Sequence, residues 1–289
     1  MSRIVVVGNR GMLGQALERR LKNRWGEGDV SGVDRESIDI AQPACGTHPV
    51  FQGAEVLFNC AAYTDVDRAE IEAAEAFAVN ADGAAHLAAA ARGHGALLVH
   101  LSTDFVFDGS AAEPYPAEAP PRPLSVYGWS KWAGEEAVLA SGARCLLVRT
   151  AWLFGFGRRN FVEAVLQQAQ EEGFLRVVCD QIGAPTFAED LAEALVGLWQ
   201  AGAEGVYHCT NRGAATRHQF ACEIVKEARL AARVEPVLAA EYPAPAPRPR
   251  YGVLDLSKTE AALGHKLRPW REALADYLAR RSALASAGE

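Results

Sequence analysis

Short apolar runs alternate with longer segments of helical pattern through the first half of the chain. The apolar runs are Ile4–Val7, Val30–Val33, Val56–Asn59, Leu97–Leu101 and Cys145–Arg149. Runs that are apolar at nearly every position are typical of strands covered on both faces of a parallel sheet. We therefore predict a strand at each of these runs.

Amphipathic, Ala-rich segments separate the predicted strands. They are Met12–Arg24, Ala73–Asn80, Asp82–Arg92 and Tyr127–Leu139. Alternating strands and helices indicate parallel strands joined by helical crossovers. The expected fold class is α/β, with a Rossmann-type doubly wound parallel sheet formed by residues 1–150.

The second half of the chain has a different pattern. Three helix starts are predicted by capping boxes, in which a Ser or Thr and a Glu or Gln three residues later satisfy free backbone N–H groups. These are Thr186-x-x-Glu189, Thr216-x-x-Gln219 and Ser257-x-x-Glu260. A further strand at Gly205–Cys209 could rejoin the sheet, and Tyr242–Pro249 has four prolines typical of an extended loop. We predict a smaller, mostly helical domain at 151–289, interleaved with the first through elements returning from about 186–209.

A glycine-rich turn follows the first predicted strand and opens the first predicted helix. Glycines at this spacing allow a tight turn and let the backbone approach a pyrophosphate at the helix N-terminus. Asp34 stands about twenty residues further on, at the end of the next strand, where its carboxylate can accept from ribose hydroxyls. Residues 1–150 are therefore predicted to be an NAD(P)-binding domain, with contacts from Gly8, Arg10, Gly11, Met12, Leu13 and Gly14.

The residues around this turn do not decide between the two nicotinamide cofactors. Asp34 favours NADH, whereas Arg10 and Arg35 could neutralise the 2′-phosphate of NADPH. Use of NADPH or NADH is therefore expected. Asp39 and Ile40 could flank the adenine, or they could form a surface turn.

Three further segments should converge, because ligands of such sheets lie at the carboxyl ends of the strands. The third strand ends in Asn59–Thr64, where small residues let the backbone pass close to the cofactor. The fourth strand ends in Ser102-Thr103-Asp104, and a Tyr-x-x-x-Lys pair follows at Tyr127 and Lys131. We predict that these segments form the reaction centre.

The Tyr-x-x-x-Lys spacing places both side chains on one helix face. A phenol has a pKa of about 10, and a nearby ammonium lowers it towards neutrality. Tyr127 is therefore the expected proton donor, and Lys131 the expected partner that lowers its pKa and binds the nicotinamide ribose. The hydroxyl of Thr103, or of Ser102, would hold the substrate oxygen as negative charge develops.

Composition excludes several other classes of protein. The 289 residues have a formal net charge of −7, which gives no reason to expect nucleic acid or an anionic membrane as a partner. No apolar run approaches the ~20 residues of a membrane span, and Met1-Ser2-Arg3 leads directly into the first strand without a signal-peptide pattern. The six cysteines are widely spaced, which predicts free thiols in a reducing cytoplasm and no metal site.

Motifs along nearly the whole chain resemble those of the extended short-chain dehydrogenase/reductase superfamily, and within it the dTDP-4-dehydrorhamnose reductase family. They are Gly8–Gly14, Asn59–Asp67, Val79-Asn80, Ser102–Gly109, Tyr127–Lys131, Arg149–Trp152, Asn160-Phe161, Asp180–Thr186, Arg248-Pro249 and Leu254-Asp255. The resemblance implies NAD(P)H-dependent reduction of the 4-keto group of dTDP-4-dehydro-L-rhamnose, a step in cell-surface polysaccharide synthesis. It also implies a possible homodimer, and Mg²⁺ is expected from the likeness alone.

The resemblance assigns roles to individual residues. It implies that Thr103, Asp104, Tyr127 and Lys131 are catalytic and that 151–289 form a substrate-binding domain. Substrate contacts would come from Thr103, Asp104, Trp152, Asn160, Gln181 and Arg248, and further cofactor contacts from Ala61, Ala62, Tyr63, Asn80, Tyr127 and Lys131. Bland alternatives stay open for four of these residues: a core position for Trp152, a helix-end hydrogen bond for Asn80, and plain loops around Gln181 and Arg248. Arg248 and Arg250 are the candidates for the substrate diphosphate, since guanidinium groups match phosphate oxygens.

Two departures and two rival functions qualify the assignment. The family often has Asn or Ser near Tyr251-Gly252, where neither side chain here supplies the same polar contact. Related dehydratases have Glu after Thr-Asp, but this chain has Phe105, which cannot transfer a proton. An epimerase would retain NAD tightly. A non-catalytic, NADP-binding regulatory subunit, like the beta subunit of methionine adenosyltransferase, is the rival from another class.

Overall fold

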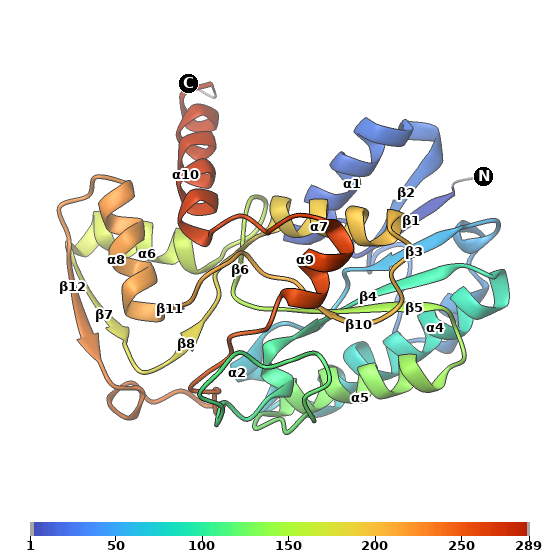
Figure 1. Cartoon of the computed structure of the whole chain (residues 1–289), viewed down its shortest axis with the longest axis horizontal. Coiled ribbons are helices and arrows are strands. Elements are labelled where there is room, and N and C mark those ends of the chain that lie inside the picture. Colours follow the sequence, from blue (N-terminus) through green and yellow to red (C-terminus); the bar gives the residue numbers. More distant parts are fainter. Residues whose placement is uncertain (1–2, 288–289) are drawn as a thin grey trace.

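A six-stranded parallel sheet forms the centre of the molecule in the computed structural model, which describes residues 3–287. Its strand order is β10-β5-β4-β3-β1-β2 (Figure 1). The bounds are β1 Ile4–Val7, β2 Val30–Val33, β3 Val56–Asn59, β4 Leu97–Thr103, β5 Cys145–Thr150 and β10 Gly205–His208. Residues 1–2 and 288–289, at the outer ends of the two predicted domains, lie outside the described residues, as does most of the predicted Met1-Ser2-Arg3 lead into the first strand.

All five strands predicted in the first half are confirmed, and the strand predicted at Gly205–Cys209 pairs with β5 at the edge of the sheet. β4 continues past the predicted Leu101 because Ser102 and Thr103 keep pairing with Arg149 and Thr150. Ser102 and Thr103, the first candidates for the reaction centre along the chain, are therefore the last two residues of a regular, buried strand. The strand order reverses between β1 and β3, and this is where such sheets bind ligands.

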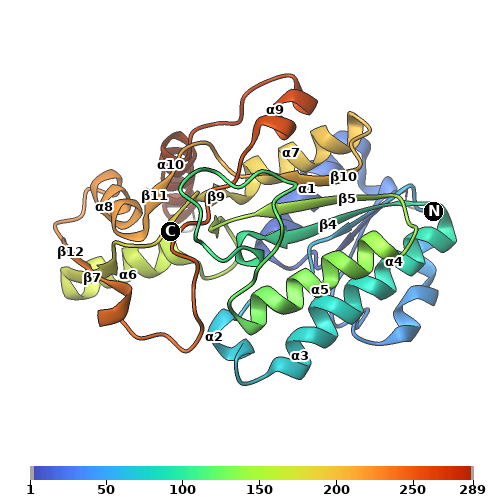
Figure 2. The same cartoon turned by 60° about the horizontal axis from the view of Figure 1, so that its bottom comes forward.

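Helices cover both faces of this sheet. On one face lie α1 (Met12–Trp25) and α7 (Ala188–Gln200), and on the other lie α4 (Gly83–His94) and α5 (Val126–Ala140), as Figures 1 and 2 show. Alternate β1 residues bury into separate cores: Ile4 and Val6 contribute to the α1/α7 side, and Val5 and Val7 to the α4 side. The α/β doubly wound fold class is thus confirmed.

The two helices predicted at Ala73–Asn80 and Asp82–Arg92 are wrong as separate elements. The chain instead runs through α3 (Ala73–Phe77), a π-helical turn (Ala78–Asp82) and α4 without a break. No glycine or proline stands inside that turn to end the helix. A π turn adds a residue to the helical circuit, and such turns are frequent at functional sites. Here the turn contains Asn80.

Only one of the three predicted capping boxes forms. Thr216 and Gln219 exchange both hydrogen bonds at the start of α8 (Arg217–Glu227). At Thr186 the hydroxyl donates to Ala184 O instead, and α7 begins one residue later. At Ser257 the hydroxyl donates to Asp255, although α9 (Ser257–Leu263) does begin there. In both failures another residue takes the N-cap position, Phe187 for α7 and Leu256 for α9, so neither hydroxyl is placed to accept the N3 N–H.

The remaining elements form a second group beside the carboxyl ends of the sheet, seen on the left of Figures 1 and 2. Its core joins Phe154, Phe187, Phe220, Trp270 and Tyr277. The elements are α6 Phe161–Glu172, α10 Trp270–Ala287 and the strand pairs β7 Phe174–Val178 with β12 Arg233–Val237, β6 Leu153–Phe154 with β9 Thr186–Phe187, and β8 Ile182–Gly183 with β11 Ala215–Thr216. Short elements complete the chain: α2 Val66–Ala69, and the 3-10 helices Glu27–Asp29, Pro43–Thr47, Pro49–Phe51, Asp104–Val106 and Ala239–Glu241. The division at residue 150 stays a prediction.

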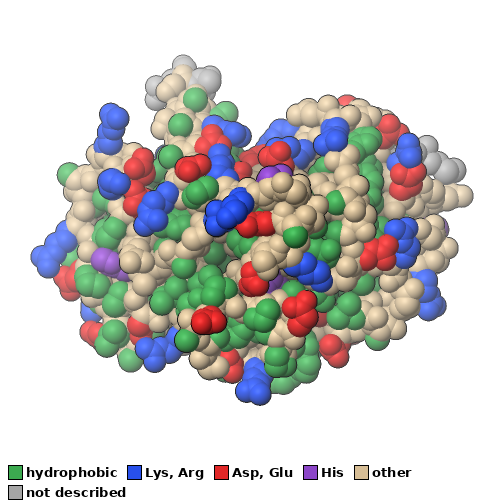
Figure 3. All heavy atoms as spheres, viewed as in Figure 1, with side chains coloured by type: hydrophobic (Ala, Val, Ile, Leu, Met, Phe, Trp, Pro, Cys, Tyr) green, Lys and Arg blue, Asp and Glu red, His purple; other side chains and the backbone are tan. Residues whose placement is uncertain are grey.

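No helix among residues 3–287 is long and apolar enough to cross a membrane. On the face in Figure 3, Lys and Arg side chains are interspersed with Asp and Glu. The acidic side chains that give the net charge of −7 therefore form no single negative patch on that face.

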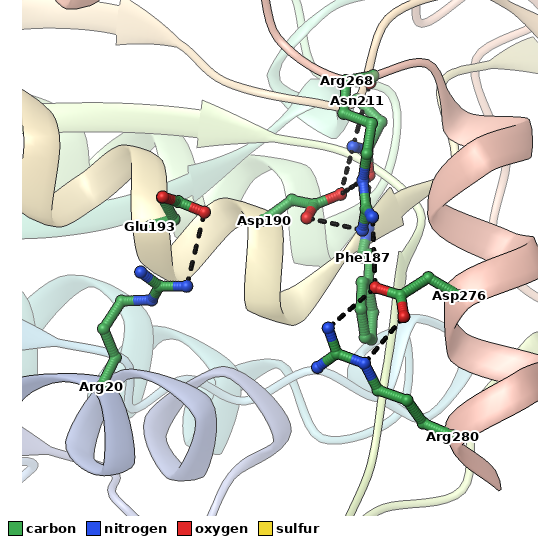
Figure 4. A network of polar contacts seen from close by, with 8 residues as sticks. All are labelled: Arg20, Phe187, Asp190, Glu193, Asn211, Arg268, Asp276 and Arg280. Carbon is green, nitrogen blue, oxygen red and sulfur yellow. Dashed lines mark hydrogen bonds and ion pairs between the residues drawn. The ribbon is translucent and has the colours of Figure 1, made fainter. Parts of the chain in front are cut away.

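A polar network ties α10 to the sheet (Figure 4). Arg268 Nη2 and Nε lie 2.7 and 3.0 Å from the two carboxylate oxygens of Asp190 on α7, and Asn211 Nδ2 lies 2.6 Å from Oδ2. Arg268 Nη1 also donates to Asp276 on α10 at 3.1 Å. One carboxylate thus joins α7, the segment after β10 and the start of α10.

The substitution Asp190→Ala should lower the free energy of unfolding by about 2 kcal/mol, because it removes a shared acceptor from the half-buried Arg268 and the buried Asn211. Glu193→Ala, on the same helix, is the matched control. Its exposed ion pair with Arg20 spans 3.4 Å and should contribute less than ~0.5 kcal/mol. Urea unfolding of the three proteins checks this, and equal losses in both variants would contradict a stabilising network.

Candidate active site

The predicted glycine turn brings β1, α1 and the end of β3 into close contact. Gly8 has φ +81°, and a Cβ there would lie 2.6 Å from Ala61 N. A Cβ on Gly14 would lie 2.1 Å from Gly8 O, so this position also excludes any side chain. The backbone after β1 and the backbone after β3 therefore lie in close contact where the strand order reverses, with no large side chain between them.

The N-terminus of α1 has the character of an anion site. Its N-cap, Gly11, makes no side-chain capping bond, and no acidic residue stands in the first turn. The free N–H groups and the helix dipole are thus available to a phosphate. The residues present fit the pyrophosphate of a dinucleotide, with backbone from Met12 and Leu13 in the first turn.

The two cations expected to hold a 2′-phosphate both face carboxylates. Arg10 Nε lies 3.1 Å from Asp34 Oδ2, and its Nη1 lies 2.6 Å from Glu36 Oε2. Arg35 Nη1 lies 3.4 Å from Glu75 Oε1. A 2′-phosphate would compete with these acids for the guanidinium groups.

The segment expected to flank the adenine is only partly exposed. Asp39 Oδ1 accepts from Ala41 N, and Ile40 is 5% exposed and packs against Gly83. The turn reading of this pair fits the structure, and contact with an adenine stays a prediction.

Asn80 joins the loop after β3 to the helix of the Tyr-x-x-x-Lys pair. Its Oδ1 accepts from Tyr63 N, and its Nδ2 donates to Tyr63 O and to Ser130 Oγ. The π turn orients this buried amide toward the site, so it is not the helix-end hydrogen bond that the sequence left open. The Tyr63 hydroxyl itself points to Glu72. Ala61, Ala62 and Tyr63 can therefore reach a cofactor only through backbone or apolar surface.

The structure brings Tyr127, Thr103 and Asp104 together. Thr103 caps the 3-10 helix that follows β4, and its hydroxyl donates to Asp104 Oδ1 at 3.0 Å. Tyr127 opens α5, behind the N-cap Ser125, and its ring meets Phe105 edge-on with centroids 5.5 Å apart. Phe105 thus stands beside the phenol, where a dehydratase would need an acid.

The predicted effect of Lys131 on Tyr127 is wrong for this structure. Burial raises the pKa of Tyr127 to about 12, a hydrogen bond with Thr103 lowers it in part, and the Asp104 charge raises it. The Lys131 ammonium instead donates to Leu101 O at 2.7 Å. Burial lowers the pKa of Lys131 to about 8, and only Glu135 opposes this. Tyr127 is therefore a protonated phenol near neutral pH, the form that a proton donor needs.

A buried ion pair lies directly beneath Lys131, and the sequence reasoning missed it. Arg149 Nη2 lies 2.6 Å from Glu135 Oε2, with both side chains at most 4% exposed. Ser102 donates to the same carboxylate, and Arg149 Nη1 donates to Ala117 O. A visible signal was the acid at position 135, one helical turn after Lys131 on the apolar face of α5.

Asp104 is the acid of the site that burial perturbs most clearly. It is 2% exposed, and burial raises its pKa to about 7 although Thr103 and the charge of Arg217 oppose the shift. A Cβ at position 252 would lie 2.6 Å from Asp104 Oδ2. The departure at Gly252 thus has a steric reason, since any side chain there would press on the carboxyl group.

The predicted substrate residues differ in the partners that they already have within the chain. Trp152 has a left-handed backbone (φ +44°), rare for a bulky residue, and its ring lies under the guanidinium of Arg217. Asn160 caps α6 and donates to Gly155 O and Arg158 O, so its amide already has partners within the chain. Arg248 is held by Asp67, with Nη2 and Oδ2 2.7 Å apart. Substrate contacts by these residues stay predictions.

Gln181 and Arg250 contribute less than expected. Gln181 offers its backbone oxygen to the N–H of Arg217, and Arg250 is exposed. Arg217 itself was missed by the sequence reasoning. No group of three or more His, Cys, Asp or Glu side chains suited to a metal ion occurs within residues 3–287. Mg²⁺ stays an expectation from the family likeness.

The raised pKa of Asp104 predicts a pH-dependent stability. Its neutral form is favoured by folding, so this stabilisation is complete below about pH 4 and is lost as pH rises through about 7. Between pH 5 and 7 the wild type should therefore lose up to ~1.4 kcal/mol per pH unit relative to Asp104→Asn. Urea unfolding at both pH values measures this difference.

Asp108→Asn is the control for that titration. Hydrogen bonds from Ser110 hold the pKa of Asp108 below its usual value, so it stays ionised across the same range. Its difference from wild type should not change between pH 5 and 7. A flat difference for Asp104→Asn as well would show that Asp104 is not perturbed.

Known proteins share this architecture over its full length. The chain matches the family described as RmlD substrate binding domain over residues 2–283. It is 43% identical to a dTDP-4-dehydrorhamnose reductase of Mycobacterium tuberculosis, covering 96% of this chain and 92% of that one. It is 38% identical to the spore coat polysaccharide biosynthesis protein SpsK of Bacillus subtilis, covering 98% and 99%.

A solved structure gives the same result in three dimensions. The dTDP-4-dehydrorhamnose reductase of Bacillus anthracis, in complex with NADP, superposes with a TM-score of 0.92 at 33% identity, covering 97% of this chain and all of that one. Sequence and structure thus agree along the whole length of the molecule. The chain belongs to the RmlD substrate binding domain family, the family of the dTDP-4-dehydrorhamnose reductases.

Proposed function

We propose that this protein reduces the 4-keto group of dTDP-4-dehydro-L-rhamnose to give dTDP-L-rhamnose, a precursor of cell-surface polysaccharide. The observation that carries the proposal is the protonated phenol of Tyr127 beside Thr103 and Asp104, at the carboxyl ends of β-strands. Relatives named as dTDP-4-dehydrorhamnose reductases, up to 43% identical over nearly the whole chain, support the choice of substrate.

The cofactor in this proposal is NADPH or NADH. Its pyrophosphate would lie at the N-terminus of α1, on the turn from Gly8 to Gly14, with the ribose near Asp34. The complex of the Bacillus anthracis relative with NADP supports this class of cofactor. When bound, the nicotinamide supplies the hydride for the carbonyl carbon.

The chain's own residues handle the proton and the charge. Tyr127 gives its phenolic proton to the carbonyl oxygen, and the hydroxyl of Thr103 holds that oxygen as it becomes an alkoxide. Lys131, fixed on Leu101 O, would place a positive charge near the nicotinamide ribose. Phe105 stands where related dehydratases have Glu and has no proton to transfer, which favours reduction over dehydration.

Replacing the phenol tests the mechanism. Tyr127→Phe should lower kcat by about 10²- to 10⁴-fold, because it removes the proton donor and keeps the aromatic ring and the glycine turn in place. Tyr207→Phe, on the edge strand β10, is the control and should retain full activity. Oxidation of NADPH or NADH with dTDP-4-dehydro-L-rhamnose is the assay. Unchanged turnover by Tyr127→Phe would refute the mechanism, and no turnover by the wild type would favour the regulatory function.

Replacing Arg10 tests how the cofactor is chosen. Arg10→Gln should raise KM for NADPH by about tenfold and leave KM for NADH nearly unchanged, because only NADPH has a 2′-phosphate to pair with the guanidinium. Steady-state kinetics with each cofactor measure the two values. Equal changes for both cofactors would show that Arg10 serves only to orient Asp34 and Glu36.

A further inference from the structure

Arg217 is a cation that its own surroundings disfavour. It is the first residue of α8, where the helix dipole repels positive charge, and no acidic residue stands in that first turn. Burial lowers the pKa of its guanidinium to about 10, the charge of Asp104 opposes this shift, and the nearby charge of Arg248 adds to it. Within residues 3–287 no carboxylate lies at ion-pair distance from it, and its side chain forms no hydrogen bond.

The same guanidinium is nevertheless held in place. Its Cζ lies 3.6 Å from the centroid of the Trp152 ring and 5.2 Å from that of Phe161. Trp152 is itself fixed in a left-handed backbone conformation and packs against Gly183. A flat, oriented guanidinium with free donors is the arrangement that recognises phosphate oxygens.

The position of Arg217 defines which part of a ligand it would meet. Its charge interacts with Asp104, at the proposed reaction centre, and with Arg248. Arg248 and Arg250 were the sequence-based candidates for the diphosphate, but Asp67 already holds the Arg248 guanidinium and Arg250 is exposed. Within the described residues, Arg217 is therefore a cation without an ion pair close to Asp104, on the side of the reaction centre where Arg248 also lies.

We propose that Arg217 binds the phosphate adjoining the sugar, the β-phosphate of the nucleoside diphosphate, with its guanidinium held flat on Trp152. The inference rests on the proposed function for the identity of the nucleotide. A bound phosphate supplies the negative charge that this end of α8 lacks. Arg217 is thus a binding residue that determines affinity for diphosphate-linked substrates.

The test compares two nucleotides that differ only in that phosphate. Calorimetric titration of the full chain with dTDP and with dTMP gives an affinity ratio for each variant. Arg217→Gln should weaken dTDP binding by about tenfold to a hundredfold and change dTMP binding less than about twofold. Arg217→Lys, which keeps the charge but not the planar fork, should fall between these limits.

Arg271→Gln is the matched control, because Arg271 also stacks on a tryptophan, Trp270, but is 60% exposed and pairs with Glu223. It should bind both nucleotides as the wild type does. Thermal unfolding without ligand should show Arg217→Gln to be folded with a Tm near that of the wild type, because removing a disfavoured cation offsets the lost contact with Trp152. If the glutamine variant does not fold, the lysine variant gives the same dTDP-to-dTMP comparison.

Three outcomes would overturn the inference. Equal losses for dTDP and dTMP would mean that Arg217 only shapes the pocket, and unchanged affinity for both would mean that it binds no phosphate. A wild type that binds dTDP no better than dTMP would exclude any β-phosphate site. These binding measurements need no turnover, so a failure of the proposed function, seen as no cofactor oxidation by the wild type, remains distinguishable.

Discussion

The buried ion pair between Glu135 and Arg149 is the interaction on which the site depends. It joins α5, which holds Tyr127 and Lys131, to β5, and Ser102 of β4 donates to the same carboxylate. Losing one partner of such a pair leaves an uncompensated charge in the core, a cost of about 3–5 kcal/mol. The pair therefore fixes α5 to the two strands, β4 and β5, that carry Thr103 and Arg149.

Burial around this pair also determines the protonation states of the site. It raises the pKa of Tyr127 and Asp104 and lowers that of Lys131. Next to Arg149, burial lowers the pKa of His208 to about 3, so that imidazole stays neutral. One physical cause thus keeps the phenol protonated and Asp104 partly protonated near neutral pH, which suits a centre that gives a proton to a carbonyl oxygen. The ammonium of Lys131 retains its charge near neutral pH through Glu135.

Several residues near Asp104 have conformations or charges that their local structure disfavours. Trp152 adopts a left-handed backbone, Arg217 places a positive charge at a helix N-terminus, and Gly252 leaves room only for the Asp104 carboxyl group. The first two features are unfavourable for folding, the third leaves space for a neighbour, and all three lie near the carboxyl ends of the strands. Such concentration is expected where binding, and not folding, selects the residues.

The sequence by itself determined the strands of the sheet, the glycine turn, the helix of Tyr127 and Lys131, and the capping box at Thr216. Those features follow from periodicity, backbone sterics and contacts within a few residues, which a linear pattern records. Only the tertiary structure decided that Lys131 turns to Leu101 and Glu135, that Phe187 and Leu256 take the N-cap positions predicted for Thr186 and Ser257, and that Arg217 lies on Trp152. These outcomes depend on competition among partners that distant segments bring within hydrogen-bonding reach, and on the burial that sets each charge. A sequence pattern contains neither.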